Sequence, residues 1–304
     1  MQFVNNNNLT PAKTFVLGAN GFIGSYFLEK YRSFYPDIMG SSYKDDEHFI
    51  KIDLLEPDIR HLNLKSRGYS SALICAAVTK VENCEKNPVQ SYAINVEGTL
   101  RVIEQLNKEN IHPIYLSSDY VFDGCTGNYS ETSPVNPVNL YGTHKATVEK
   151  AIPQICGSNY TILRLSKIFS SDYGTTSFLS GMISDIVSGK TVKAAYDQIF
   201  CPTLIKDLLH IVLEIQKNNL SGLFNVCSPE VMSRYALAQR IALLCKVDPG
   251  NIIRISIDDL NEKFHRPHDT SMICNKITDI IKARFTPIDN CILTLANNRS
   301  INYA

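Results

Sequence analysis

Residues 14–24 read TFVLGANGFIG, and this stretch decides the fold class. The apolar run TFVL leads directly into Gly18, Gly21 and Gly24, spaced G-x-x-G-x-x-G. A short apolar run that ends at glycine is typical of a buried β-strand. We expect the residues that follow, 22–34, to form a helix, so the stretch predicts a strand, a tight turn and a helix in succession.

This turn has the features of a phosphate-binding loop. Glycines allow a tight turn, a close approach of the backbone to phosphate and close packing of the helix on the strand. Free N–H groups at the start of the helix would point at an anion. We expect the loop to bind the pyrophosphate of a dinucleotide; an ordinary structural turn is the alternative. The residues concerned are Gly18, Asn20, Gly21, Phe22, Ile23 and Gly24.

The end of the second expected strand bears on the choice of cofactor. An acidic residue there would bind the ribose diol of NAD. Residues 40–44 read GSSYK instead, with no acid before Asp45. The hydroxyl of Ser42 and the ammonium group of Lys44 suit a 2′-phosphate, so NADP is favoured and NAD is the alternative. Lys44 could equally be a solvated loop charge.

Asp53, followed by Leu54, ends the third expected strand. A carboxylate at this place could accept a hydrogen bond from the adenine amino group of the cofactor. The alternative is that Asp53 only caps the end of the strand.

Segments of strand and helix character alternate along the first half of the chain. Further strands are expected at 38–41, 49–52, 72–77, 113–117 and 160–165, and helices at 88–110 and 141–152. Apolar strands alternating with helices predict a parallel sheet covered on both faces. Right-handed crossovers then favour a doubly wound, Rossmann-like α/β fold.

The second half is less regular. Helices are expected at 178–188, 204–217, 235–245 and 277–281, and short strands near 191–194 and 223–226. We expect a dinucleotide-binding domain over residues 1–168, to which some later segments return. Residues 169–304 would form mainly a smaller α/β substrate-binding domain.

A set of reactive side chains follows two of these elements. Tyr141 and Lys145 lie four residues apart and share one face of the expected helix. A nearby ammonium group favours phenolate, and a tyrosine tuned in this way can donate a proton to a carbonyl near neutral pH. Ser118 and Asp119 end the fifth strand, at the edge where open parallel sheets bind ligands. The Ser118 hydroxyl could hydrogen-bond the same carbonyl oxygen.

Composition excludes several classes of protein. Of 304 residues, 44% are hydrophobic and 20% charged, and 30 basic residues balance 30 acidic ones. This argues against nucleic-acid binding or membrane binding through bulk positive charge. No apolar run reaches the roughly 18–20 residues of a membrane helix, and residues 1–14 lack the pattern of a signal peptide.

The cysteines and histidines indicate compartment and metal content. Nine scattered cysteines without a CxxC spacing fit reduced thiols, so we expect a cytoplasmic protein. His265 and His268 are the one tight pair with metal-like spacing. They lie in a proline-containing loop, HRPH, and we expect no metal site there.

Six stretches together resemble the extended short-chain dehydrogenase/reductases, close to the dTDP-4-dehydrorhamnose reductase type. They occur in that family's order and span nearly the whole chain. The stretches are GANGFIG (18–24), AAVTKVENCE (76–85), SSDYVFDG (117–124), YSETSPVNPVNLYGTHK (129–145), DQIFCPT (197–203) and RPHDTSM (266–272).

The resemblance implies roles at the matching positions. Ser118 would orient the substrate carbonyl and Tyr141 would be the general acid of the reduction. Lys145 would hold the nicotinamide ribose and tune Tyr141. On the cofactor side, Ala76 and Ala77 would line the cofactor, and Asn95 would brace the active-site helix. The substrate side would use Thr79, Val81, Ser118, Asp119, Gln198 and Arg266.

Positions 118–120 separate reactions within this superfamily. The related 4,6-dehydratases resemble a Thr-Asp-Glu pattern here, whereas this chain has Ser-Asp-Tyr and lacks the second acid. The GDP-fucose synthase type needs a cysteine soon after the serine, and Cys125 lies several residues further on. Plain hydride transfer with one proton donor is therefore the expected reaction. Phe200 and Cys201 depart from the expected small residues, which leaves the shape of the substrate pocket open.

The resemblance implies an NADPH-dependent reductase of a 4-keto-6-deoxy nucleotide sugar. One alternative is a nucleotide-sugar 4-epimerase that uses the same three residues. Another is a non-catalytic NADP-binding subunit like the regulatory subunit of methionine adenosyltransferase, which shares SSDYVFDG and a nearby LYG segment. The resemblance also implies a homodimer paired through helices 88–110 and 141–152, with neither nucleic acid nor membrane as a partner.

Overall fold

The computed structural model describes residues 10–172, 174–260 and 263–300. The stretch 1–9, most of the segment considered above for a signal peptide, lies outside them. The chain forms two compact units. Unit 1 comprises the described residues up to Ser117, with His144–Leu163 and Leu209–Leu223. Unit 2 comprises Ser118–Thr143, Arg164–Leu208 and the described residues from Phe224 on.

A five-stranded parallel sheet forms the centre of the fold, which confirms the predicted Rossmann-like class. Its strand order is β1 (Thr14–Leu17), β4 (Ser71–Ile74), β5 (His112–Ser118), β6 (Thr161–Leu165) and β11 (Gly222–Val226). The residues of β1 and β4 are all buried, because helices cover both faces. The first expected strand is confirmed at both ends.

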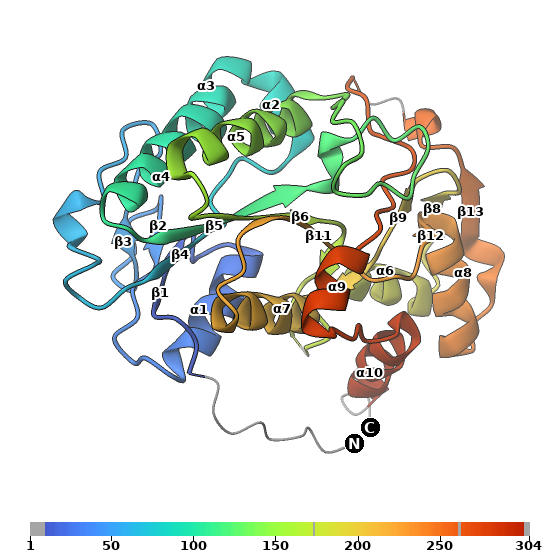
Figure 1. Cartoon of the computed structure of the whole chain (residues 1–304). Coiled ribbons are helices and arrows are strands. Elements are labelled where there is room, and N and C mark those ends of the chain that lie inside the picture. Colours follow the sequence, from blue (N-terminus) through green and yellow to red (C-terminus); the bar gives the residue numbers. More distant parts are fainter. Residues whose placement is uncertain (1–9, 173, 261–262, 301–304) are drawn as a thin grey trace. The chain divides into compact units, whose positions relative to one another are not determined.

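Helices lie on both sides of the strands of unit 1 (Figure 1). On one side lie α1 (Phe22–Arg32) and α7 (Ile205–Lys217), and on the other α2 (Val81–Lys86), α3 (Pro88–Tyr92), α4 (Thr99–Lys108) and α5 (Leu140–Cys156). The short helix α2 was not predicted. This layering leaves the carboxyl ends of the strands as the place where loops gather.

The second and third expected strands are shorter than predicted. β2 (Ser41–Ser42) and β3 (Ile50–Lys51) pair with each other in parallel. Gly40 extends this pair toward the sheet through a parallel bridge with Val16. A Cβ on Gly40 would lie 2.5 Å from the Cβ of Ala19, so close packing on the first turn requires glycine here.

The single helix predicted over 88–110 is divided into three. A π-helical segment, η2 (Ala93–Gly98), separates α3 from α4. Gly98 packs so tightly that an added Cβ would lie 1.9 Å from the carbonyl oxygen of Leu54. Such π-helical turns occur frequently at functional sites.

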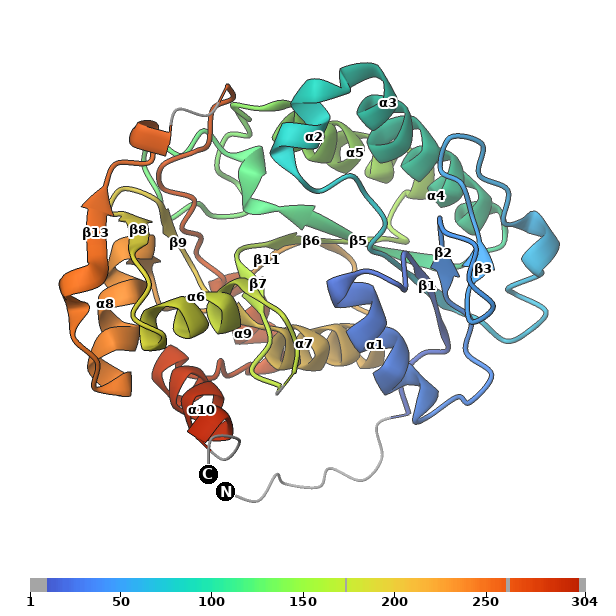
Figure 2. The same cartoon turned by 180° about the vertical axis from the view of Figure 1, so that it is seen from behind.

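The described residues of unit 2 include three two-stranded sheets and four helices of their own. The strand pairs are β7 (Ile168–Phe169) with β10 (Thr203–Leu204), β8 (Val192–Ala195) with β13 (Ile252–Ile255), and β9 (Ile199–Phe200) with β12 (Met232–Ser233). The helices are α6 (Phe178–Val187), α8 (Arg234–Cys245), α9 (Asn275–Ile281) and α10 (Ile288–Ser300). Side chains of α6, α8 and α10 share one apolar core. Figure 2 shows these three helices next to one another. The sequence analysis missed α10 and most of these short strands.

Short 3₁₀ helices complete the described elements. They are η1 (Arg60–Leu62), η3 (Asp119–Val121), η4 (Pro249–Asn251) and η5 (Asp258–Leu260). Of these, η3 follows directly on β5 and carries part of the site described below.

The domain boundary expected between residues 168 and 169 differs from the division of the chain into the two units. Residues 118–143 pack within unit 2, because Tyr129 donates its N–H to the carbonyl of Ser271 (2.9 Å) and accepts from the N–H of Ile273 (2.9 Å). Residues 209–223 belong to unit 1.

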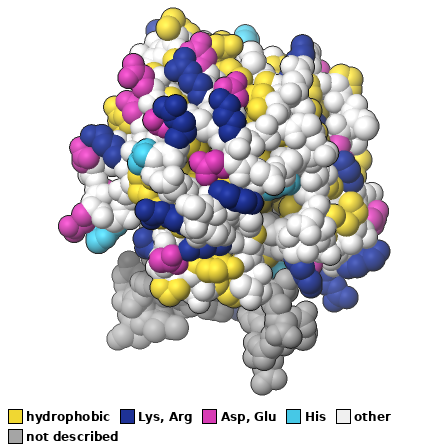
Figure 3. Space-filling view, turned by 60° about the vertical axis from the view of Figure 1, so that its left-hand side comes forward, with side chains coloured by type: hydrophobic (Ala, Val, Ile, Leu, Met, Phe, Trp, Pro, Cys, Tyr) yellow, Lys and Arg dark blue, Asp and Glu magenta, His cyan; other side chains and the backbone are white. Residues whose placement is uncertain are grey.

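Charges of both signs are interspersed on the surface. Figure 3 shows Lys and Arg side chains beside Asp and Glu side chains on the face that it presents. Exposed pairs such as Lys51–Asp45 and Arg60–Asp58 are examples. Within the described residues, we find no helix of the length and apolar character needed to cross a membrane.

Candidate active site

The glycine turn between β1 and α1 is shaped by two of its three glycines. Gly18 has φ +84, and an added Cβ would lie 2.6 Å from the backbone nitrogen of Ala76. A Cβ on Gly24 would lie 2.2 Å from the carbonyl oxygen of Gly18. Only glycine fits at both positions, which lets α1 pack close to β1.

Gly21 has no comparable structural reason to be glycine. Its φ is −80, and an added Cβ would meet one neighbouring atom at an ordinary 3.4 Å. Gly21 is exposed and is the N-cap of α1, where backbone N–H groups lack helical partners. The space above it is therefore suited to a ligand anion that approaches the backbone closely.

The residues expected near the adenosine part of the cofactor differ in their exposure and in their hydrogen bonds. Ser42 is buried, and its hydroxyl accepts from the N–H of Lys44 (3.0 Å). Lys44 is exposed. Asp53 accepts from the N–H of Leu55 (2.9 Å) in the turn after β3, and Leu54 is buried.

Asn95 connects the π-helical segment to the loop after β4. Its amide oxygen accepts from the N–H of Val78 (2.7 Å), and its amide nitrogen donates to the Val78 carbonyl (2.9 Å). The same nitrogen lies 3.3 Å from Nδ1 of the buried His144 in α5. Asn95 thus braces α5 through His144 and holds the chain that follows Ala76 and Ala77.

Lys145 is a buried ammonium group in α5. Its Nζ donates to the carbonyl of Leu116 in β5 (2.7 Å) and lies 4.6 Å from the ring centre of Tyr115. Burial lowers the pKa of Lys145 to about 8, although Cys75 and Glu149 favour the charged form. Glu149 itself accepts from the Ser117 hydroxyl (2.5 Å).

Ser118 is the last residue of β5 and the N-cap of η3. Its hydroxyl oxygen accepts from the N–H of Tyr120 (3.2 Å), and its hydrogen is donated to the Asp119 carboxylate (3.0 Å). Asp119, expected on the substrate side, is only 6% exposed. Both carboxylate oxygens of Asp119 accept hydrogen bonds within unit 2.

Tyr141 lies at the start of α5 and is half-buried. Its ring meets that of Tyr120 edge to face, with centroids 6.0 Å apart. The next residue is Gly142, where an added Cβ would lie 2.0 Å from the carbonyl oxygen of Tyr120. Glycine at this position brings the start of α5 against the chain that carries Ser118. Lys145 lies one helical turn after Tyr141 in α5.

The residues expected on the substrate side differ in exposure. Thr79 is exposed, whereas Val81 begins α2 and is 5% exposed, so its side chain is largely in the core of unit 1. The Gln198 carbonyl accepts from the N–H of Arg234 (3.0 Å). The Arg266 guanidinium lies 5.0 Å from the ring centre of Phe264.

Two cations of unit 2 were missed by the sequence analysis. Burial lowers the pKa of Lys167, the charges of Arg234 and Arg266 lower it further, and the charge of Asp119 opposes this fall. Burial also lowers the pKa of Arg234, and Arg266 adds to this effect. We call Lys167, Arg234 and Arg266 the cation group. Single basic residues in separate segments form no sequence motif. The grouping of these three residues could therefore be found only from the folded structure.

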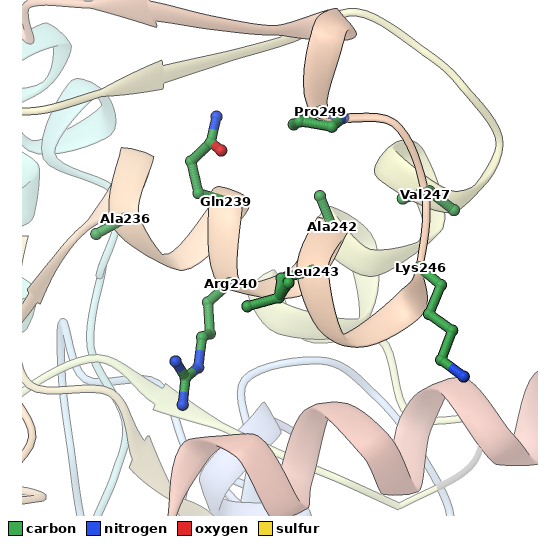
Figure 4. A pocket seen from close by; sticks show the side chains of 8 residues that line it. All are labelled: Ala236, Gln239, Arg240, Ala242, Leu243, Lys246, Val247 and Pro249. Atoms are coloured by element: carbon green, nitrogen blue, oxygen red, sulfur yellow. The ribbon is translucent and has the colours of Figure 1, made fainter.

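Two other features of the described residues lie apart from this chemistry. A shallow pocket on α8 is lined by Gln239, Leu243, Val247 and Pro249 among others, and by none of the predicted site residues (Figure 4). Arg240 at its rim is paired with Asp289 through Nε (2.7 Å). No group of three or more His, Cys, Asp or Glu side chains in the part described could hold a metal ion.

Two relatives and one solved structure give the comparison with known proteins. A probable low-salt glycan biosynthesis reductase of Haloferax volcanii is 29% identical over 265 residues, 83% of this chain and 87% of that protein. Methionine adenosyltransferase 2 subunit beta of Danio rerio is 23% identical over 92% of this chain and 88% of its own length. A dTDP-4-dehydrorhamnose reductase of Bacillus anthracis, solved in complex with NADP, has a TM-score of 0.79 at 23% identity and covers 92% of this chain and 96% of its own.

The chain also matches the model of a protein family. The enzyme class expected from the sequence, an NAD(P)-dependent oxidoreductase, is confirmed. The model of one family, described as RmlD substrate binding domain, matches residues 12–297. Because this match spans nearly the whole chain and the fold is that of the extended short-chain dehydrogenase/reductases, the protein belongs to the RmlD substrate binding domain family.

Proposed function

We propose that this chain is an NADPH-dependent reductase of a 4-keto-6-deoxy nucleotide sugar. The observation that carries the proposal is the start of α5, where Gly142 brings Tyr141 against the chain of Ser118, one helical turn before Lys145. A phenol, a hydroxyl and a buried ammonium group at the carboxyl edge of a parallel sheet are the parts needed to reduce a ketone.

Each of the three side chains has a distinct role in this proposal. Tyr141 donates its phenolic proton to the carbonyl oxygen of the substrate. Ser118 donates a hydrogen bond to the same oxygen and holds it in place. The Lys145 ammonium group, held by the Leu116 carbonyl, stabilises the tyrosinate that remains. The bound nicotinamide supplies the hydride for the carbonyl carbon.

The cofactor fits the glycine turn. Gly21 has no side chain, so a pyrophosphate group can approach the backbone closely at this point. Gly21 is the N-cap of α1, and a helix N-terminus favours such an anion. NADP is favoured over NAD because Lys44 is an exposed cation after β2, where an acid would be needed to bind the ribose diol.

The cation group supports an anionic substrate. Three cations that repel one another in a partly buried place are stabilised by an anion that binds among them. The guanidinium groups of Arg234 and Arg266 match phosphate oxygens well. A nucleoside diphosphate carries these oxygens, and the family's name and the Haloferax relative's glycan role agree with a nucleotide sugar.

The test is NADPH oxidation followed at 340 nm with dTDP-4-dehydrorhamnose as the ketone. We expect consumption of NADPH, and a loss of about 10²–10⁴-fold in kcat for Tyr141→Phe. The variant should keep NADPH binding, measured as the shift in melting temperature, because the phenol does not hold the pyrophosphate. An equally active Tyr141→Phe would contradict the assigned role.

A second function is favoured by the match to the beta subunit of methionine adenosyltransferase over 92% of this chain. In that case the chain would bind NADP and regulate an enzyme without turning over a sugar. Absence of NADPH oxidation with every keto sugar nucleotide, together with a stable complex with a methionine adenosyltransferase catalytic subunit in gel filtration, would favour this function over the reductase.

A further inference from the structure

Asp119 is the centre of a buried network of hydroxyl groups. One carboxylate oxygen accepts from Ser118 (3.0 Å). The other accepts from Ser166 (3.0 Å) and Thr270 (2.8 Å). Ser166 in turn accepts from the N–H of Cys201 (3.1 Å). The hydroxyls come from three separate segments of unit 2, so the position of Asp119 is set by the fold and not by one loop.

The network conflicts with the role proposed for Ser118. A serine hydroxyl has one hydrogen. In this structure that hydrogen is donated to Asp119, while the oxygen accepts from the N–H of Tyr120. To donate to a substrate carbonyl, Ser118 has to give up its bond to Asp119. An ionised carboxylate only accepts hydrogen bonds, so it competes with the substrate for this hydrogen.

The conflict is removed when Asp119 is neutral. We propose that Asp119 is a positioning residue that sets the direction of the Ser118 hydroxyl: protonated Asp119 donates to the Ser118 oxygen and frees its hydrogen for the substrate, whereas ionised Asp119 retains it. Ser118 then accepts from Tyr120 and Asp119 and donates to the carbonyl oxygen. Asp119 takes up one proton from solvent when it becomes neutral, and the direction of its hydrogen bond with Ser118 then reverses; no proton passes from Asp119 to the substrate. This inference rests on the proposed reductase function.

The surroundings of Asp119 favour its neutral form more than the surroundings of an exposed aspartate would. Burial raises the pKa of Asp119, and the hydrogen bonds from Thr270, Ser118 and Ser166 oppose this rise. Lys167 is the charged group whose field also opposes it. The pKa of Lys167 is itself lowered by burial and by the charges of Arg234 and Arg266, which favours loss of this opposing charge. An anionic substrate among these cations would raise the pKa of Asp119 further.

The experiment compares two substitutions of Asp119 in the full-length protein. In Asp119→Asn the amide nitrogen can donate to Ser118 and its oxygen can accept from Ser166 and Thr270, as the neutral acid would. We expect kcat of the wild type to fall with rising pH as Asp119 ionises, below the range in which Lys145 titrates. Asp119→Asn should lose this fall and exceed the wild type on its alkaline side. Asp119→Ala should lower kcat by about tenfold or more, toward the ~10²–10³-fold cost of losing an oxyanion donor.

Thr270→Val is the matched variant on the other carboxylate oxygen. It removes a hydrogen bond that favours the ionised form, so the pKa of Asp119 rises and the fall in kcat moves to higher pH. A purely structural role for Asp119 would change stability and leave the position of this fall unaltered. An Asp119→Asn enzyme that retains the wild-type fall, or a Thr270→Val enzyme in which the fall does not move, overturns the inference.

A second measurement is independent of turnover. The carboxyl ¹³C resonance of Asp119, identified in labelled protein by its loss in Asp119→Asn, should titrate above the ordinary aspartate value of about 4 and higher again in Thr270→Val. A midpoint at or below the ordinary value overturns the inference even if no keto sugar is turned over. Failure of NADPH oxidation with a raised midpoint would instead count against the proposed function alone.

Discussion

Lys145 combines a proposed chemical role with a cost in stability. Its ammonium group is buried and donates to the carbonyl of Leu116 through a 2.7 Å hydrogen bond. Burial lowers the pKa of Lys145 to about 8, below its ordinary value of 10.5. Folding therefore disfavours the charged form that the proposed reaction needs, and the protein is expected to gain stability when this charge is removed.

The sign of the pH effect follows from these values. Between about pH 8 and 10.5 the unfolded chain keeps the Lys145 proton and the folded chain has lost it. Stability rises with pH wherever the unfolded state binds more protons. The free energy of unfolding should thus rise by roughly 1 kcal/mol from pH 7 to 9 through this residue alone.

Lys145→Met tests both statements. The variant should lose this pH dependence, unfold at the same or higher denaturant concentration at pH 7, and lose about 10²-fold in kcat. Urea unfolding at pH 7 and 9 beside a kinetic assay measures all three. Lys150→Met, an exposed neighbour on α5, is the control that should change none of them. Marked destabilisation of Lys145→Met at pH 7 would contradict the argument.

At the scale of elements, the three glycines of the turn between β1 and α1 are present for different reasons: two are required for packing, and the third is predicted to serve cofactor binding. Gly18 and Gly24 are required by the close contact of α1 with β1. Gly21 is not, because its backbone conformation and surroundings admit a Cβ. A ligand that approaches the backbone is the remaining physical reason for glycine there.

Gly21→Ala and Gly24→Ala form a matched pair. Gly21→Ala should change the free energy of unfolding by less than about 1 kcal/mol, as expected for an N-cap position, and weaken NADPH binding at least tenfold. Gly24→Ala should destabilise by roughly 1–3 kcal/mol through overpacking. Urea unfolding and NADPH fluorescence titration give both quantities. Normal NADPH binding by Gly21→Ala would count against the turn as a pyrophosphate site.

At the scale of the whole molecule, assembly stays a prediction. The interface implied by the sequence includes residues 88–110. In the structure, Val89 and Tyr92 of α3 are 84% and 41% exposed. Two apolar side chains at this exposure on one short helix agree with a surface that a second copy of the chain would cover.

Val89→Asp should separate such a dimer. We expect the wild type to sediment at about twice the chain mass of 34.1 kDa and the variant at the chain mass. A charge that is buried without a partner at an interface is costly, which is the reason for the dissociation. Leu243→Asp on α8 is the control, since Leu243 is also exposed, at 68%, but lies outside the predicted interface. A wild-type protein that sediments as a monomer would refute the pairing.

Much of the site was accessible from the sequence because its signals are local. The predictions for Gly18, Gly24 and the pair Tyr141 and Lys145 depend on spacing within one turn or one helix; the structure has Gly18 and Gly24 in the turn after β1 and the other two residues on α5. β1 was predicted to the residue because a continuous apolar run before glycine has few alternatives.

The missed parts depend on contacts distant in sequence. The helix predicted over 88–110 contains a π-helical segment because Asn95 bonds to Val78, which periodicity does not reveal. Residues 118–143 belong to unit 2 through Tyr129 and its partners beyond residue 270. The cation group likewise combines single basic residues from separate segments.

The sequence by itself therefore determined the fold class and predicted the phosphate-binding turn and the reactive side chains, since local backbone conformation and short spacings encode them. Only the tertiary structure decided that Lys145 is buried, that Asp119 is surrounded by hydroxyls, and that Lys167 lies beside Arg234. Burial and electrostatic environment are properties of the packed chain, because they depend on which segments exclude water around a group.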